Sequence, residues 1–207
     1  MTRVLILGAN GTLARNTARV LLDDPAVALT LYLRQAGRLK NTARDRVRIV
    51  DGDMLDETKL RHAMKDQDLV YANLAGDMAA QARTIIDAMH ATDLTRLIFI
   101  SSMGIYGEVP GETYRSVLDP YRDSAALIEA SDLDYTILRP GWFTGKQEGP
   151  YRITQKGEPF QGHDIALDSL SALIAKIVTT TPDLYLRRSI GVSDGQQTSP
   201  TKKEGNV

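Results

Sequence analysis

The chain has 207 residues, and its 25 lysines and arginines nearly balance its 26 aspartates and glutamates, for a formal net charge of −1. This balance provides no general attraction to nucleic acid or to an anionic membrane, so we expect neither as a partner. The absence of cysteine excludes disulfides, thiolate nucleophiles and cysteine-ligated metals. Because no apolar run approaches the roughly 18 residues of a membrane span, we expect a cytoplasmic protein.

Short apolar runs rich in β-branched residues alternate with longer amphipathic stretches. The expected strands are residues 4–7, 29–33, 47–50, 69–72, 97–101 and 135–138, and the expected helices are residues 12–22, 57–65, 78–90, 118–130 and 169–180. This alternation predicts βαβ units. Because several runs lack polar alternation, their strands should be parallel and covered on both sides. The predicted fold is therefore α/β: a single Rossmann-type, doubly wound parallel sheet with helices on both faces.

Local signals predict further boundaries. Asp56 and Asp168 precede predicted helices and are expected as N-caps, and Pro182 is expected to end the last helix. Residues 184–192 should add an edge strand. Residues 193–207 are polar, contain few large apolar side chains, and are expected to form a loose tail.

Residues 140–165 differ from the rest because they are rich in glycine and aromatic side chains and show little periodicity. Long loops in compact domains are usually functional. This one follows the sixth strand, at the carboxyl edge of the sheet where open α/β folds bind ligands. We therefore expect a substrate loop within a domain of residues 1–192. Its aromatic residues, expected either to stack on a planar acceptor or to pack the loop on the body, are Trp142, Phe143, Tyr151 and Phe160.

The first strand leads into GANGTLA at residues 8–14. A tight turn at Gly8, followed by a helix from about Thr12, would direct unpaired backbone N–H groups to one point, where an anion can bind. Gly11 would let the backbone approach a pyrophosphate, and the small Ala14 would let the helix pack against the strand. The pattern predicts a dinucleotide site, with a purely structural turn as the alternative. Its expected members are Gly8, Asn10, Gly11, Thr12 and Leu13.

The end of the second strand carries Arg34, followed by Arg38 and Lys40. NAD-specific sites have an acidic residue at this place to bind the ribose, whereas a guanidinium suits a 2′-phosphate. One charge-assisted hydrogen bond contributes about 1.5 to 3 kcal/mol, or a roughly ten- to hundredfold preference. We therefore expect NADP(H) to be favoured over NAD(H). The alternative is that these cations form only a solvated surface.

With these residues in place, the chain resembles the short-chain dehydrogenase/reductase superfamily. It is most similar to the atypical NAD(P)H-binding members, among them the NmrA-like proteins and the small flavin and biliverdin reductases. The resemblance covers about residues 3–192. It rests on GANGTLA, DGDMLD at 51–56, NLAG at 73–76, FISSMGIYG at 99–107 and LDYTILRPGWFTG at 133–145.

The resemblance implies positions for further cofactor-binding residues. Asp53 and Met54 would lie beside the adenine, and Leu74 and Ala75 would line the adenosine ribose and pyrophosphate. Ser101, Ser102 and Pro140 would lie near the nicotinamide. The alternative for these positions is structural: a strand-end aspartate, ordinary core side chains and a helix-capping serine.

The chain departs from the family pattern at one catalytic position. Members that reduce carbonyls combine a serine with a YxxxK pair, in which the ammonium one helical turn away lowers the tyrosine pKa. Here Ser102 matches the serine and Tyr121 the tyrosine, but Ala125 stands at the lysine position. An unassisted tyrosine titrates near pH ~10. Ser102 and Tyr121 are therefore the candidate catalytic residues, and Tyr121 is equally open to being a helix-surface or pocket-lining residue.

This departure favours acceptors that take hydride without a tuned protein acid, such as flavins, quinones and extended conjugated systems, with carbonyl compounds less favoured. Solvent or the hydroxyl of Ser102, Tyr106 or Tyr121 would supply the proton. We expect an NADPH-dependent oxidoreductase with a small-molecule acceptor, acting as a monomer or homodimer. The alternative is an NAD(P)H-binding sensor of the NmrA-like type, without catalysis. His163 is more simply a solvated loop residue than a proton donor, and the histidine spacing predicts no metal site.

Overall fold

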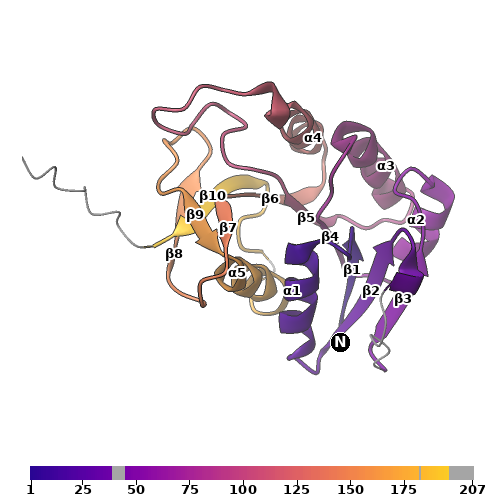
Figure 1. Ribbon diagram of the computed structural model, residues 1–207. Helices are drawn as coiled ribbons and strands as arrows, with labels where there is room; N and C mark the ends of the chain where they lie inside the picture. Colours follow the sequence, from indigo (N-terminus) through magenta and orange to yellow (C-terminus); the bar gives the residue numbers. More distant parts are fainter. Residues whose placement is uncertain (39–44, 182, 196–207) are drawn as a thin grey trace, which may run out of the picture.

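The structure, a computed structural model, describes residues 1–38, 45–181 and 183–195 (Figure 1). Some of the sequence features discussed above fall outside this range. Lys40, Pro182 and most of the expected tail lie outside the described residues, and so does the side chain of Arg38.

An eight-stranded sheet forms the centre of the described chain, in the order β3-β2-β1-β4-β5-β6-β10-β8. Its strands are β1 (Thr2–Leu7), β2 (Val27–Leu33), β3 (Val47–Asp51), β4 (Leu69–Ala72), β5 (Arg96–Ile100), β6 (Asp134–Pro140), β8 (Tyr151–Gln155) and β10 (Arg188–Asp194). Neighbouring strands run parallel except for β8, which is antiparallel to β10. The first six positions have the Rossmann order, in which the chain reverses direction across the sheet beside β1. The predicted fold class is confirmed.

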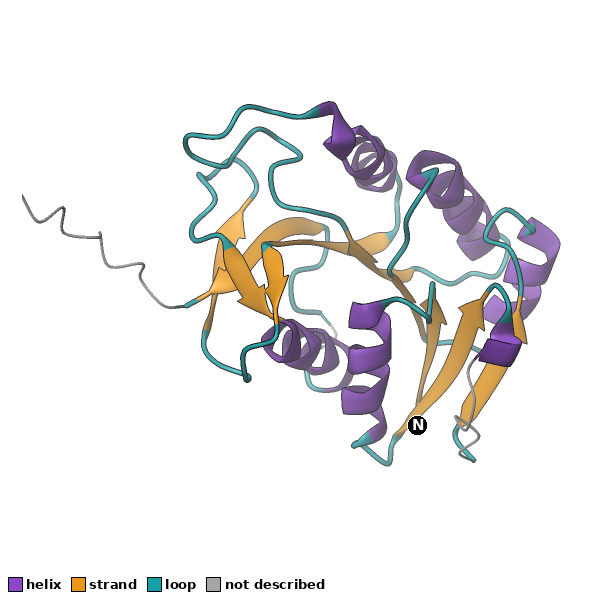
Figure 2. Cartoon of the chain, viewed as in Figure 1, coloured by secondary structure: helices purple, strands orange, loops and turns teal. Residues whose placement is uncertain are grey.

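Helices cover both faces of the sheet (Figure 2). On one face lie α1 (Thr12–Leu22) and α5 (Leu167–Thr179), and on the other α2 (Glu57–Met64), α3 (Met78–His90) and α4 (Asp119–Ala130). Two short 3-10 helices, η1 (Ala36–Arg38) and η2 (Ser116–Leu118), lie in connections. Successive β1 residues point to opposite faces, so Val4 and Ile6 join one hydrophobic cluster and Leu5 and Leu7 the other.

The two expected N-caps have different outcomes. Asp56 caps α2, since its carboxylate accepts the Lys59 N–H at 3.0 Å. The prediction for Asp168 is wrong, because α5 already begins at Leu167 and Ala166 occupies the cap position. Asp168 lies in the first turn, where its carboxylate accepts a hydrogen bond from Asn16 Nδ2 at 2.8 Å. It therefore ties α5 to α1.

The strand expected at residues 184–192 is present from Arg188 onward, but its expected position at the edge of the sheet is wrong. β10 begins at Arg188 and lies between β6 and β8, inside the sheet. Residues 184–187 form a turn in which Tyr185 and Arg187 have φ angles of 60° and 52°. Because β10 runs on to Asp194, the first residues of the expected tail belong to the sheet.

The expected substrate loop, residues 140–165, contains regular structure. It includes β7 (Trp142–Thr144), β8 and β9 (Asp164–Ala166), and β7 and β9 pair in a small parallel sheet of their own. β8 returns to the main sheet as its edge. These strands are only three to five residues long, so their pairing partners stabilise them more than any local pattern does.

Candidate cofactor and acceptor site

The turn after β1 requires glycine at residue 8. Gly8 has a φ of +74°, and its N–H donates to the Tyr32 carbonyl at 3.0 Å. A Cβ atom built at this position would lie 2.1 Å from the carbonyl oxygen of Asn73 on the neighbouring strand end. Both the left-handed backbone and the contact exclude a side chain. The chain can therefore turn sharply between β1 and α1.

Gly11 is the N-cap of α1 and has no side chain with which to accept the amides of the first turn. Its own N–H donates to the Gly8 carbonyl at 3.0 Å. The next three N–H groups of the helix therefore have no intrahelical partner, and the first turn holds no acidic residue. A Cβ at Gly11 would lie 2.8 Å from Asn73 Nδ2. These features together fit the phosphates of a dinucleotide.

A groove of about 750 Å³ lies beside this turn, at the carboxyl ends of β1 to β4. Its lining includes these residues expected from the sequence: Gly8, Asn10, Gly11, Arg34, Asp53, Met54, Leu74 and Ala75. Thr12 is exposed at the start of α1, whereas Leu13 is buried in the core. Ser101 and Pro140 lie at the ends of β5 and β6, outside the groove lining.

Sequence reasoning missed other residues of the groove lining. They are Tyr32, Leu33, Gln35, Gly52, Leu55, Asn73 and Gln81. Gly52 and Asn73 lie within the motifs DGDMLD and NLAG, so the sequence could have identified them as residues of the site. Tyr32 could not be identified in this way, because in the sequence it looks like one more apolar residue of a strand.

Tyr32 supports the floor of the groove at the end of β3. Its hydroxyl donates to the Asp53 carbonyl at 2.8 Å, and a Cβ on Gly52 would lie 2.2 Å from that hydroxyl oxygen. Burial, together with the negative charges of Asp56, Asp53 and Asp51, raises the pKa of Tyr32 to about 12. The hydroxyl is therefore a permanent donor at neutral pH, and it fixes the turn that carries Asp53.

Arg34 extends from the end of β2 into solvent, with 78% of its side chain exposed. Its nearest acidic partner is Asp53, at 3.8 Å from Nη1 to Oδ2, and such an exposed pair contributes little. Asp51 holds the backbone beneath it, because its carboxylate accepts the N–H groups of Gln35 and Ala36 at 3.3 and 2.9 Å. The guanidinium thus stands on a fixed turn and can reorient toward a ligand.

The loop after β5 is joined to the end of β6. The Ser101 N–H donates to the Leu138 carbonyl at 2.8 Å, and the Met103 N–H donates to the Pro140 carbonyl at 3.1 Å. The Ser102 hydroxyl between them donates to the Met103 carbonyl at 3.1 Å. The structure therefore brings Ser101, Ser102 and Pro140 together.

The tyrosine and lysine positions of the family pattern lie on α4. Ser101 Oγ donates to the Tyr121 carbonyl at 3.3 Å, which places this helix against the loop. In the described chain no hydrogen bond joins the hydroxyls of Tyr121 and Ser102. Ala125 is completely buried in the core below α3 and α4. A lysine there would enter the core, so in this chain α4 does not present that position to a cofactor.

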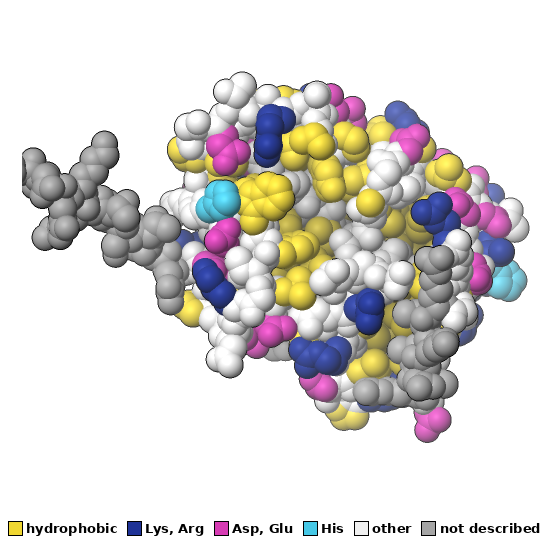
Figure 3. All heavy atoms as spheres, in the orientation of Figure 1, with side chains coloured by type: hydrophobic (Ala, Val, Ile, Leu, Met, Phe, Trp, Pro, Cys, Tyr) yellow, Lys and Arg dark blue, Asp and Glu magenta, His cyan; other side chains and the backbone are white. Residues whose placement is uncertain are grey.

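The aromatic residues of the 140–165 segment separate into two groups. Phe160 is buried and packs over Gly191, and Tyr151 is half-buried against the core. For these two residues the second expectation holds, namely that the aromatic side chains pack the segment on the body of the protein. Trp142 and Phe143 in β7 are 56% and 47% exposed. Figure 3 shows hydrophobic side chains gathered on this face, over the region between β7 and α4.

His163 lies beside this exposed pair. Its ring centroid is 6.5 Å from that of Trp142, and its Nδ1 lies 2.7 Å from Asp164 Oδ1. Tyr106, the third candidate hydroxyl, is not available, because it donates its hydrogen to Glu129 at 2.9 Å, while its oxygen lies 3.1 Å from the Ser189 hydroxyl. Burial also raises its pKa well above the usual range.

The described residues contain neither a metal-binding cluster nor a membrane-spanning helix. No group of three or more histidine, aspartate or glutamate side chains there could hold a metal ion. No helix in the same ranges has both the length and the apolar character needed to cross a membrane.

Comparison with known proteins agrees with this geometry. A family model described as NAD(P)H-binding matches residues 8–181, which include the glycine turn and the whole groove. The chain belongs to the NAD(P)H-binding family. A Rossmann-fold NAD(P)-binding family protein from Shigella flexneri is 39% identical, and the match covers 96% of this chain and 98% of that one, with a TM-score of 0.82.

Two further relatives of this NAD(P)H-binding protein have reductase in their descriptions. A short-chain dehydrogenase/reductase (wide type) from Veillonella parvula, solved in complex with NADP, is 25% identical over 94% of this chain and 95% of that one, with a TM-score of 0.86. The isoflavone reductase homolog IRL from Zea mays is 26% identical over 153 residues, 70% of this chain. The chain spans about half the length of that curated relative. The expected resemblance to NAD(P)H-binding, short-chain-reductase-like proteins is confirmed.

Proposed function

We propose that the protein is an NADPH-dependent oxidoreductase that passes hydride to a small conjugated acceptor, such as a flavin or quinone. One observation carries the proposal. The groove that fits a dinucleotide and the exposed aromatic pair of β7 lie at the same, carboxyl, edge of one sheet. Ligands of open α/β folds bind at that edge. A cofactor in the groove would therefore extend toward the ends of β5 and β6.

In this proposal the chain binds and orients NADPH, which supplies the hydride when bound. The amides at the start of α1 bind the pyrophosphate, beside Gly8 and Gly11. Arg34 binds the 2′-phosphate, with Asp53 and Met54 beside the adenine and Leu74 and Ala75 along the ribose. The loop of Ser101 and Ser102 and the strand end at Pro140 receive the nicotinamide.

The acceptor end favours conjugated compounds over simple ketones. Ala125 is buried and stands where the family pattern has a lysine, so no ammonium one helical turn away assists the Tyr121 hydroxyl in protonating an alkoxide. Flavins and quinones spread the incoming negative charge and can take their proton from solvent or from a hydroxyl of Ser102 or Tyr121. Trp142 and Phe143 offer exposed rings on which a planar acceptor can stack.

The test is NADPH oxidation, followed by its absorbance and fluorescence, with a panel of flavins, quinones and α-dicarbonyls. We expect NADPH to bind, and to be consumed fastest with a flavin or quinone. Trp142→Ala and Phe143→Ala should raise KM for that acceptor without changing NADPH affinity. Val117→Ala is the matched control, since Val117 is an exposed apolar residue outside the aromatic pair. Consumption with α-dicarbonyls alone would refute the conjugated-acceptor assignment.

A second function, NADPH sensing without catalysis, is favoured by one observation, namely the core position of Ala125. This alternative predicts NADPH binding that depends on Arg34, together with no consumption for any acceptor. The same assay therefore separates the two functions.

A further inference from the structure

The loop that follows Ser102 is built around one buried carboxylate. Glu108 Oε1 accepts the Gly104 N–H at 3.1 Å, and Oε2 accepts the Tyr106 N–H at 2.9 Å. Gly104 and Gly107 have φ angles of +83° and +69°, which let this short segment curl around the side chain. Successive backbone N–H groups of this kind form an anion-binding nest. Here the anion bound by these N–H groups is the carboxylate of Glu108, from the same loop.

The charge on Glu108 is matched from the sheet. Arg139, in β6, is completely buried and forms an ion pair and hydrogen bond with Glu108, whose side chain is 6% exposed. The same guanidinium donates through Nε to Ser189 Oγ at 3.1 Å in β10, and it stacks on the Tyr106 ring at 5.0 Å. Arg139 is thus held by the sheet on one side and holds the loop on the other.

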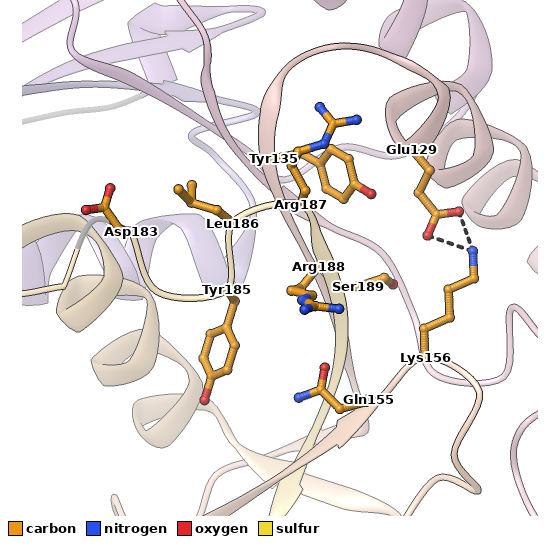
Figure 4. A pocket seen from close by; sticks show the side chains of 10 residues that line it. All are labelled: Glu129, Tyr135, Gln155, Lys156, Asp183, Tyr185, Leu186, Arg187, Arg188 and Ser189. Atoms are coloured by element: carbon orange, nitrogen blue, oxygen red, sulfur yellow. Dashed lines mark hydrogen bonds and ion pairs between the residues drawn. The ribbon is translucent and has the colours of Figure 1, made fainter.

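The outer end of this network reaches the surface. The Tyr106 hydroxyl donates to Glu129, which in turn pairs with Lys156 at 2.7 Å. Figure 4 shows Glu129 and Lys156 joined at the side of a pocket of about 760 Å³. Solvent therefore reaches this end, whereas the pair of Glu108 and Arg139 is dry.

A dry ion pair is a costly way to stabilise a fold, because apolar side chains of similar volume often do as well or better. Its position here points to another use. Arg139 directly precedes Pro140, and Glu108 holds the loop that begins at Ser102, so one pair fixes both segments that meet at the acceptor end.

We infer that Glu108 and Arg139 are positioning residues that set the geometry of Ser102 and Pro140 against the bound nicotinamide. Neither residue lines the cofactor groove, so NADPH affinity should not depend on them. The expected effect of these residues on turnover rests on the proposed reductase function. Its structural part, the ordering of the loop by the pair, stands independently of that function.

The test compares Glu108→Gln with the matched control Glu112→Gln, an exposed glutamate in the same loop. Glu108→Gln keeps the shape of the side chain but removes the charge. We expect turnover of the acceptor to fall about ten- to a hundredfold, as a small misplacement of reacting groups would cause, with NADPH affinity unchanged. Amide hydrogen exchange at Gly104 and Tyr106 should quicken about tenfold or more, since a charge-assisted acceptor is lost. The control should match the wild type.

Arg139→Lys serves as the second variant, since it keeps the charge and loses the forked contacts. It should show the same split, with lower turnover and unchanged NADPH affinity. Wild-type turnover in both variants would overturn the inference, and so would an equal loss of NADPH affinity. If the wild type reduces no acceptor, the proposed function fails, and hydrogen exchange alone decides. Unchanged exchange at Gly104 and Tyr106 in Glu108→Gln would then overturn the inference, and faster exchange would uphold the ordering role of the pair.

Discussion

Substitution by alanine should affect the two glycines of the first turn differently: at Gly8 it should reduce stability, and at Gly11 it should weaken cofactor binding. In Gly8→Ala, a φ of +74° costs roughly 1 to 2 kcal/mol for a residue with a Cβ. The methyl group would also lie 2.1 Å from a backbone oxygen that cannot rotate away, which adds about 1 to 3 kcal/mol. Alanine also makes the unfolded chain less flexible than glycine does, which stabilises the folded state by only about 0.4 to 1 kcal/mol. We expect Gly8→Ala to lower the free energy of unfolding by about 3 kcal/mol.

Gly11→Ala should leave stability nearly unchanged and weaken cofactor binding. Its φ of −63° suits alanine, and the 2.8 Å contact is with the end of the Asn73 side chain, which can move. The new methyl group would lie where the backbone should approach the pyrophosphate. Urea unfolding followed by circular dichroism measures the first effect, and NADPH fluorescence titration measures the second. If Gly11→Ala destabilised the fold more than Gly8→Ala, or bound NADPH as tightly as the wild type, the account of this turn would be wrong.

Three further predictions concern the groove and the acceptor end. Arg34→Gln should weaken NADPH binding about ten- to a hundredfold with little effect on NADH, and an unchanged ratio of the two dissociation constants would refute the 2′-phosphate assignment. Tyr32→Phe should lose about 1 kcal/mol of stability at neutral pH. Because folding raises the pKa of Tyr32 from 10.0 to about 12, its contribution is complete below pH 10 and is lost as the pH rises toward 12. A pKa shift of this size outweighs about 1 kcal/mol, so in urea unfolding the wild type should lose its advantage within this range and become less stable than the variant near pH 12. Tyr121→Phe should slow flavin or quinone reduction less than about tenfold but carbonyl reduction about a hundredfold, and equal losses would contradict the distinction between acceptors.

The sequence was most informative where local geometry and function coincide. Gly8 and Gly11 could be interpreted from spacing alone, because a strand, a turn and a helix in immediate succession leave few ways to satisfy the backbone. The Rossmann-type fold class followed from the alternation of apolar runs, most of which are buried in the sheet, with the edge strand β3 as an exception. Arg34 was found because it stands at a fixed distance from the glycine motif.

The sequence was least informative where distant segments complete each other. β8 and β10 form a pair because β8 returns from the segment after β6, and neither strand reveals that pairing locally. Asp168 looked like an N-cap because the sequence does not show that β9 leads directly into α5. Glu108 looked like an ordinary loop glutamate until Arg139, 31 residues later, was placed against it. Ala125 marked a missing lysine, but only the packing of α4 explains why a lysine does not fit.

The antiparallel edge strand β8 has a consequence for how acceptor preference could change. It anchors the far end of the segment that begins at Gly141, whose N–H donates to the Val192 carbonyl in β10 at 2.9 Å, so both ends of that segment are fixed to the sheet. The side chains of Trp142 and Phe143, by contrast, face solvent. Substitutions there can alter the contact surface while the scaffold keeps its shape, and randomising these two positions is therefore the most economical library for redirecting the proposed reductase to a new acceptor.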